Sequence, residues 1–330
     1  MERRELAGTG RKVSAVGLGT WQFGDGWGHI PEADVRGVLE AAVEGGVDLI
    51  DTADVYGDGR SERLIGRFLR DFRASPAERP TVATKFGRRG PQEAGSFTLD
   101  NLRAWADRSR ENLGTERLDL VQLHTPPDEV FASDAVFDAL DTLVEEGRTA
   151  AYGVSVETCD QALSAIRRPG VASVQIILNI FRRKPLERVL PEAAAAGVGV
   201  FARVPLASGL LSAKFRRETR FAADDHRSYN RNGEQFDVGE TFSGVDYATA
   251  VEASAEFAEL APDGITPAQA ALRWVTQQEG VTSVIPGASS TAQARANAAV
   301  GSLAPLPQPL LDQLRDLYDA RIRDQVHHRW

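Results

Sequence analysis

Four ionisable side chains stand at or near the ends of apolar segments in this sequence. Asp51, Lys85 and His124 each close a segment that reads as a buried strand, and Tyr56 lies shortly after Asp51. If these segments are strands of a (β/α)₈ barrel, their carboxyl ends share one mouth and the four side chains meet there. A tyrosine, a lysine, an aspartate and a histidine at one site suit proton transfer to a carbonyl oxygen. The pattern therefore favours carbonyl reduction.

Lys85 carries much of this interpretation. A lysine at the end of an apolar strand needs a partner, because an unpaired buried charge is costly. Unlike arginine, a buried lysine shifts its pKa and exchanges protons. Asp51 is the candidate partner. From these two residues alone, a structural Lys–Asp pair without a catalytic role is an equal alternative.

Strand-like and helix-like segments alternate along the chain. We predict strands at 16–19, 47–50, 81–85, 118–123, 150–154, 174–178, 198–204 and 283–285, after a hairpin at about 4–14. Helices are predicted at 31–44, 61–69, 98–113, 133–146, 158–166, 186–196 and 267–277. This alternation predicts an α/β fold, a (β/α)₈ TIM barrel. A doubly wound sheet is less favoured, because the segment 17–22 lacks the third glycine of a dinucleotide-binding turn.

Two further features concern domain organisation. No linker or shift in composition divides the chain, so we expect a single domain over residues 1–330. A long polar loop at about 207–246 follows the seventh strand on the mouth side. A loop of this length in a compact domain usually has a function, and we expect it to act as a lid.

Composition excludes several classes of function. The formal net charge of -9 argues against a nucleic-acid surface. The single cysteine, Cys159, excludes an intrachain disulfide and fits a reducing compartment. The charged N-terminal residues lack the apolar core of a signal peptide, and no segment is apolar for long enough to span a membrane. We expect a cytoplasmic protein with a small-molecule substrate, no nucleic-acid or membrane partner and no metal, in an oligomeric state that the sequence leaves open.

The residues at the strand ends also belong to longer motifs, and these resemble the aldo-keto reductases. The motifs are DTADVYG at 51–57, ATKF at 83–86, LHTP at 123–126, YGVS at 152–155, PLASGLL at 205–211 and IPGASS at 285–290. The resemblance extends from Gly17 to Asn297 in order and spacing. It is strongest to the bacterial branch of the family that has a long loop after strand seven.

The resemblance implies a catalytic tetrad of Asp51, Tyr56, Lys85 and His124, in a barrel that binds NADPH in an extended form. Tyr56 would donate a proton to the carbonyl oxygen as the carbonyl carbon receives a hydride from the nicotinamide. Lys85, held by Asp51, would lower the pKa of Tyr56 from its usual value of about 10. His124 would hydrogen-bond the carbonyl oxygen, as a neutral imidazole or as an imidazolium.

The resemblance also places a set of cofactor contacts. These are Gly19, Thr20, Trp21, Asp51, Ser155, Gln175, Arg203, Pro205, Leu206, Gly209, Leu211, Lys214, Ile285, Gly287, Ser289, Gln293 and Asn297. Three departures from the family, at four positions, stand out: Val156 replaces a frequent Asn, Arg203 replaces an aromatic residue that often stacks on the nicotinamide, and Gly287 with Gln293 replace a Lys and an Arg. Ser289, Ser290, Arg295 or loop arginines would then receive the 2′-phosphate. NADP(H) is the expected cofactor, with NAD(H) left open.

The expected substrate pocket is lined by aromatic and catalytic residues. These are Trp21, Phe23, Trp27, Tyr56, Phe86 and His124. Aromatic side chains suit aldehydes, ketones or stacked sugar rings. The leading hypothesis is an NADP(H)-dependent oxidoreductase that reduces aldehydes or ketones, or oxidises the corresponding alcohols or sugars. The alternative is an NADPH-binding redox sensor with little turnover. A hydrolase or isomerase would need paired carboxylates or a metal cluster at the strand ends.

Overall fold

The computed structural model describes residues 1–6, 8–24, 30–72 and 79–330. Eight parallel strands follow one another around the sheet in chain order: β3 (Leu18–Gly19), β4 (Leu49–Asp51), β5 (Thr81–Phe86), β6 (Leu120–His124), β7 (Tyr152–Ser155), β8 (Val171–Ile177), β9 (Gly199–Arg203) and β10 (Ser283–Val284). The first and last strands meet, since the amide of Gly17 donates to the Val284 carbonyl over 2.8 Å. The sheet is closed, and the predicted α/β barrel is confirmed.

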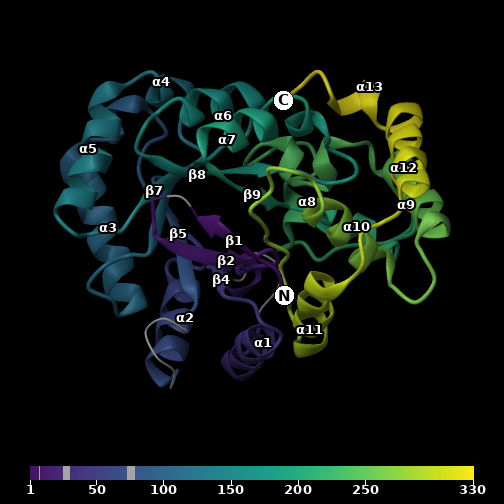
Figure 1. Ribbon diagram of the computed structural model, residues 1–330, viewed down its shortest axis with the longest axis horizontal. Coiled ribbons are helices and arrows are strands. Elements are labelled where there is room, and N and C mark those ends of the chain that lie inside the picture. The colour runs from purple at the N-terminus through teal and green to yellow at the C-terminus, as the bar shows by residue number, and fades with distance from the viewer. Residues whose placement is uncertain (7, 25–29, 73–78) are drawn as a thin grey trace.

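Helices surround these strands (Figure 1). The predicted helical segments correspond to α1 (Glu32–Glu44), α2 (Arg60–Asp71), α3 (Leu99–Leu113), α5 (Asp134–Glu145), α6 (Cys159–Ile166), α7 (Val189–Ala196) and α10 (Pro267–Thr276). The sequence pattern does not predict α4 (Asp128–Phe131), α9 (Tyr247–Leu260), α12 (Gln308–Arg321) or α13 (Arg323–Val326); α11 (Thr291–Ala299) follows β10. No helix within the described ranges is long and apolar enough to cross a membrane.

Local signals fix where several helices begin and end. Thr158 forms a capping box with Gln161, and Thr266 forms one with Gln269, each satisfying free backbone amides at a helix start. Gly114 ends α3 with a φ of 64°, a left-handed conformation that glycine adopts without steric cost. The predicted boundaries of these helices follow from the same residues.

The inside of the barrel is apolar at one end and polar at the other. Leu6 of β1 (Arg3–Leu6) and Val13 of β2 (Arg11–Ser14) form the predicted hairpin and pack against inward-facing barrel residues, which are Leu49, Ala83, Leu120, Ala151, Ala172, Phe201 and Ile285. Side chains alternate between the two faces of a strand, so Asp51 and Lys85, two positions further along, face the same interior. The hairpin thus closes one end, and the ionisable residues lie toward the other.

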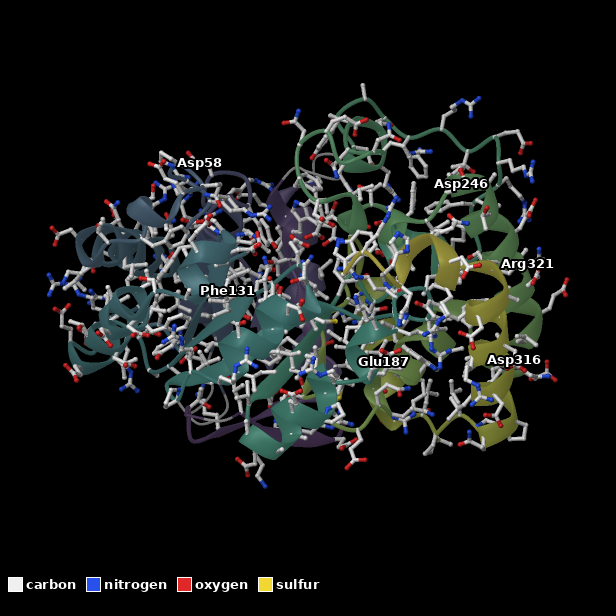
Figure 2. All side chains as sticks on the ribbon, turned by 90° about the horizontal axis from the view of Figure 1, so that it is seen from above. Asp58, Phe131, Glu187, Asp246, Asp316 and Arg321 are labelled. Carbon is white, nitrogen blue, oxygen red and sulfur yellow. The ribbon has the colours of Figure 1, made fainter. Side chains whose placement is uncertain are left out.

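The segment between β9 and α9, predicted as a long polar loop, is divided by short helical turns. It contains the short turns η4 (Ala207–Ser212), α8 (His226–Tyr229), η5 (Val238–Glu240) and η6 (Phe242–Gly244). Arginines hold these turns together, since the guanidinium of Arg231 lies 4.7 Å from the ring centre of Tyr247 and that of Arg227 lies 4.4 Å from Phe221. In Figure 2, Asp246 at the end of this segment lies toward the same edge of the molecule as Asp58 after β4, away from the hairpin.

Candidate active site

A buried lysine with three polar neighbours forms the centre of the site. Lys85 Nζ donates to Asp51 Oδ2 at 2.7 Å and to the Thr52 carbonyl at 2.9 Å, and it lies 3.5 Å from the Tyr56 hydroxyl. Lys85 and Asp51 are almost fully buried. An ammonium group has three protons. Two are taken by strong acceptors, and the third is directed at Tyr56.

Neighbouring strands hold these groups in place. The register of β4 and β5 pairs Asp51 with Ala83, which sets Lys85 slightly further toward the mouth. The second oxygen of Asp51 accepts a hydrogen bond from Gln175 on β8 at 2.7 Å, across the inside of the barrel. Both carboxylate oxygens are therefore used, and the carboxylate cannot rotate away from Lys85 without breaking a buried hydrogen bond.

Burial and charge set the protonation of these groups. Burial acts to lower the pKa of Lys85, but the Asp51 carboxylate and the Tyr56 hydroxyl together outweigh it and the pKa is raised. Burial raises the pKa of Tyr56, and Lys85 opposes this shift without reversing it. Lys85 therefore acts on the pKa of Tyr56 in the expected direction, while burial keeps the net shift upward. Lys85 reduces the cost of ionising a buried phenol.

His124 lies against Tyr56, with ring centres 6.0 Å apart and the planes nearly perpendicular. Burial lowers the pKa of His124 well below its usual value, and Arg88, Lys85 and Arg203 add to the effect. The sequence left open whether this histidine is neutral or charged, and the structure favours the neutral imidazole. A neutral ring offers one N–H donor.

The four residues open onto a cavity of about 810 Å³. Most of the expected cofactor residues line it, namely Gly19, Thr20, Trp21, Asp51, Ser155, Gln175, Arg203, Pro205, Leu206, Gly209, Lys214, Ile285, Gly287, Ser289, Gln293 and Asn297. The lining extends from β4 and β5 to the start of α11, so one continuous groove joins Tyr56 to Gln293. An elongated ligand fits such a groove.

Several expected site residues lie elsewhere. Phe23 and Phe86 are fully buried core residues and do not line the described cavity, so their assignment to the substrate pocket is wrong. Phe86 follows the inward-facing Lys85 on β5, so it points out of the barrel, where it packs against Trp105 of α3 with 5.9 Å between ring centres. Leu211 is likewise buried in the core away from the cavity. Arg295 pairs with Glu44 over 3.3 Å instead of lining the groove. Trp27 lies outside the described residues.

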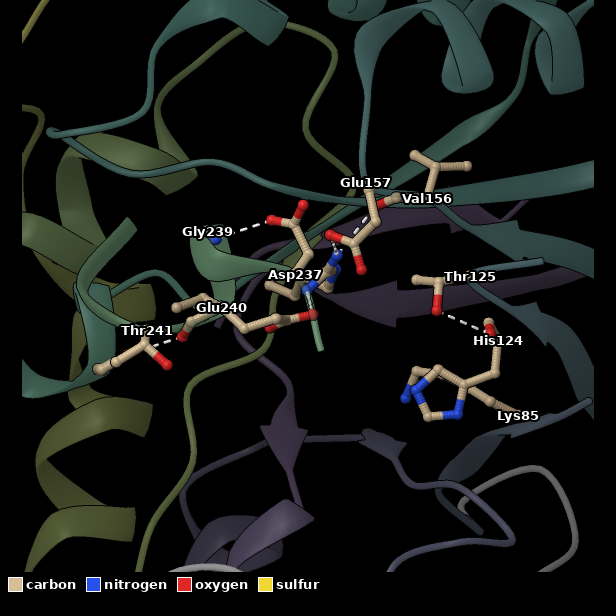
Figure 3. A network of polar contacts seen from close by, with 12 residues as sticks. Lys85, His124, Thr125, Val156, Glu157, Asp237, Gly239, Glu240 and Thr241 are labelled. Atoms are coloured by element: carbon tan, nitrogen blue, oxygen red, sulfur yellow. Dashed lines mark hydrogen bonds and ion pairs between the residues drawn. The ribbon is translucent and has the colours of Figure 1, made fainter. Parts of the chain in front are cut away.

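Arg203 belongs to a second polar cluster at the mouth, whose other members Val156, Glu157 and Glu240 are labelled in Figure 3. Its guanidinium contacts Glu240 through Nη1, and Nη2 lies 2.9 Å from both Glu157 Oε2 and the Val156 carbonyl. Burial works against the charged guanidinium, but the two carboxylates outweigh it and raise the pKa of Arg203. Arg203 lines the cavity but is held by both carboxylates, which restricts its freedom to reorient.

Sequence reasoning missed a further set of cavity residues. These are Arg88, Tyr229, Phe236 and Glu240, of which the last three lie in the segment after β9. Phe236 meets Trp21 edge-on at 5.9 Å between ring centres. The high polarity of the segment hid these contacts, and the periodicity that reveals strands and helices does not exist in short turns.

The groove contains groups that suit a nucleotide cofactor. Lys214 lines it and makes no ion pair within the described ranges. At the other end, the backbone amide of Ser289 donates to Gln293 Oε1 at 2.8 Å, beside the start of α11, where a helix favours negative charge. Gln175 donates to Asp51 through its amide nitrogen, which leaves its carbonyl oxygen to accept from a carboxamide. Among the described residues no cluster of His, Cys, Asp or Glu is suited to hold a metal ion.

Comparison with known proteins places the chain in a family. The model of the Aldo/keto reductase family matches residues 15–319, so this chain belongs to that family. An oxidoreductase of Mycobacterium bovis is 32% identical over 310 residues, covering 92% of this chain and 88% of the relative.

Two solved structures extend the match to three dimensions. The glycerol dehydrogenase of Gluconobacter oxydans is 29% identical, with a TM-score of 0.78 over 97% of this chain and 96% of that one. An aldo/keto reductase from Klebsiella pneumoniae, in complex with NADP and acetate, is 25% identical, with a TM-score of 0.68 over 94% of this chain and 93% of that one. The fold and the oxidoreductase class are shared across these matches.

Proposed function

We propose that this protein is an NADPH-dependent reductase of aldehydes or ketones, with Tyr56 as the proton donor. The observation that carries the proposal is the Lys85 ammonium, which is fixed by Asp51 and the Thr52 carbonyl and directs its remaining proton toward Tyr56. His124 stands beside the same phenol at the cavity. Family membership supports the reaction class.

The residues divide the proton chemistry between them. When bound, NADPH supplies a hydride to the carbonyl carbon, and the developing alkoxide then needs a proton. Tyr56 gives its phenolic proton to that oxygen, and Lys85 stabilises the phenolate left behind. Asp51 keeps Lys85 charged and in place. Neutral His124 donates an N–H to the carbonyl oxygen and orients it.

We infer that the cofactor lies along the groove from Tyr56 to Gln293. Ser155 and Gln175 would face its carboxamide, and Lys214 its phosphates. The preference for NADPH over NADH rests on the family relative crystallised with NADP, and on Lys214 and Ser289 in the groove. The segment 207–246 would serve as a lid, because η4, Lys214 and Arg227 border the groove.

Turnover and cofactor binding test the proposal together. NADPH oxidation would be followed with a reactive aromatic aldehyde for the parent protein and for Tyr56→Phe, and NADPH binding would be measured separately for both. Loss of a general acid typically costs about 10²- to 10⁴-fold in turnover. We expect a loss of this size in Tyr56→Phe, with NADPH affinity kept.

The other outcomes separate the alternatives. A parent protein that binds NADPH but does not turn over a panel of aldehydes and ketones would favour the redox-sensor function. Turnover that persists unchanged in Tyr56→Phe would show that another group donates the proton. His124→Gln serves as a second variant, since it keeps a neutral donor at the carbonyl and should lose less activity than Tyr56→Phe.

A further inference from the structure

Trp330 lies outside the cavity yet contacts the residues that support the Arg203 cluster. Its indole is nearly buried, with 6% of its surface exposed. The guanidinium of Arg182 lies over the ring, 3.9 Å from its centre. The indole Nε1 donates to the Asp237 carboxylate, at 3.1 Å from Oδ1 and 3.3 Å from Oδ2.

The first connection to the active site runs through Asp237. Asp237 Oδ1 also accepts from the Gly239 amide at 2.7 Å, which fixes the start of the η5 turn (Figure 3). Glu240 is the last residue of that turn, and its carboxylate pairs with Arg203. Trp330 thus holds Asp237, which fixes the η5 turn. That turn carries Glu240, one of the two carboxylates that pair with Arg203.

The second connection runs through Arg182. Its Nη2 donates to the Glu157 carbonyl at 2.6 Å, while the Glu157 side chain lies 2.9 Å from Arg203. Arg182 is itself buried, and Trp330 covers one face of its guanidinium. Both carboxylates that hold Arg203 are therefore linked, by different routes, to the same indole.

The packing around the indole leaves no spare room. A methyl group added at Gly244 would lie 2.4 Å from the Trp330 ring, and one added at Gly239 would lie 2.1 Å from Arg182 Nη1. Gly244 also has a φ of 73°, which favours glycine. The two glycines allow the backbone of this segment to approach Trp330 and Arg182 closely.

We propose that Trp330 is a positioning residue for Arg203, acting through Glu240 and Glu157. Without the indole, Arg182 loses its stacking partner and Asp237 loses a donor, so the η5 turn relaxes and Arg203 is no longer held in one orientation. Because Arg203 lines the groove, the consequence is weaker NADPH binding, and in this respect the proposal rests on the proposed function. The Lys85 site is untouched, so turnover at saturating NADPH changes little.

A double-mutant cycle on NADPH affinity tests this coupling. The dissociation constant would be measured by calorimetry for the parent, Trp330→Ala, Glu240→Ala and the double variant. Coupling between linked residues corresponds to about a fivefold to tenfold change in affinity. We expect Trp330→Ala to weaken binding by about that factor in the parent background, and by less than half of that factor when Glu240 is already absent. Equal factors in both backgrounds would overturn the proposal.

Trp105→Ala is the matched control, because it removes the same side chain where it packs on Phe86 and Phe97, away from Arg203. It should lower stability and leave NADPH affinity unchanged. Trp330→Phe should show an intermediate loss, since it keeps a ring over Arg182 and loses the donor to Asp237. A loss of affinity in Trp105→Ala as large as in Trp330→Ala would reduce Trp330 to a general structural role and overturn the proposal.

Amide hydrogen exchange of the protein without NADPH gives a reading that does not depend on the proposed function. Residues 237–244 should exchange faster in Trp330→Ala than in Trp105→Ala, with β4 and β5 unchanged in both. If the parent protein does not bind NADPH, the proposed function fails, and the hydrogen-exchange comparison alone tests whether Trp330 is a positioning residue. Faster exchange in Trp330→Ala then supports the positioning role, and equal exchange overturns it.

Discussion

Two polar clusters border the same cavity, and they are built in opposite ways. Asp51 and Lys85 lie on adjacent strands whose register fixes their distance, and Tyr56 follows a few residues later. Arg203 also ends a strand, but one of its carboxylate partners, Glu240, comes from a short turn in the irregular segment after β9. Groups that transfer protons need fixed geometry, which strands supply better than loops. The Arg203 cluster depends on how that segment packs.

The charge balance of the two clusters differs as well. Lys85 faces one carboxylate and one phenol, whereas Arg203 faces two carboxylates. Burial raises the pKa of Glu240 in spite of Arg203, while Arg203 and other arginines outweigh burial and lower the pKa of Glu157. The first cluster keeps a cation ready beside a proton donor. The second holds a cation in place.

Removing each cation should therefore have different consequences. Lys85→Met should lower kcat by about 100-fold or more, because Tyr56 loses the charge that stabilises its phenolate. Arg203→Met should mainly raise the KM for NADPH, by about tenfold, with a smaller change in kcat. Steady-state kinetics with NADPH and one aldehyde measure both. Similar losses of kcat in the two variants would contradict the division of roles.

Asp54, which lies beside the Lys85 cluster, should make the stability of the protein depend on pH. Its amide donates to the Lys85 carbonyl at 2.9 Å, and its buried carboxylate has no hydrogen-bond partner among the described residues. Burial, with Glu62 nearby, raises its pKa to about 7 from 3.8. The folded state therefore retains a proton that the unfolded state loses between about pH 4 and 7, and stability falls as pH rises through that range.

Asp54→Asn removes this penalty. Its stabilising effect should be on the order of a few kcal/mol at pH 8 and should shrink toward zero near pH 4. Urea denaturation at both pH values measures it. The exposed Asp316→Asn is the control, which should show no such difference between the two pH values. A gain for Asp54→Asn that is the same at pH 4 and pH 8 would mean that the carboxylate is not the cause.

Replacing each carboxylate of the Arg203 cluster in turn tests which of the two contributes more to stability. Glu157→Gln should cost more stability than Glu240→Gln, by about 1 kcal/mol, because the Glu157 carboxylate lies near two arginines, 2.9 Å from Arg203 and 3.5 Å from Arg88, whereas Glu240 pairs with Arg203 alone among the described residues. Denaturation at pH 7 measures the difference. Equal costs would indicate that Arg203 pairs equally with both charges.

The smallest expected effect concerns the core beneath the first cluster. Phe86→Leu should cost about 1 kcal/mol of stability and leave kcat and the aldehyde KM unchanged, since Phe86 is fully buried and does not line the described cavity. Phe236→Leu, at the cavity, should change the KM for an aromatic aldehyde instead. A change of aldehyde KM in Phe86→Leu would return Phe86 to the substrate pocket.

The sequence by itself determined the barrel and its strand-end chemistry. Alternating strands and helices require a parallel sheet, and period-two alternation then sends Asp51 and Lys85 to one interior. The sequence pattern did not predict that Phe23 and Phe86 lie in the core. An apolar residue next to a catalytic residue gives the same sequence signal whether its side chain faces the core or the cavity. The sequence pattern also did not predict helix α9, because its many alanines give a weak amphipathic signal.

Only the tertiary structure decided how distant segments meet. The pairing of Arg203 with Glu240, the seating of Trp330 on Arg182 and the approach of Phe236 to Trp21 join residues far apart in the chain. Short turns have no repeating pattern that predicts such contacts, and these depend on packing against the finished barrel. The amino-acid pattern within each segment determines the strands. The contacts between distant segments form only once the barrel has closed and the segment after β9 has packed on its mouth.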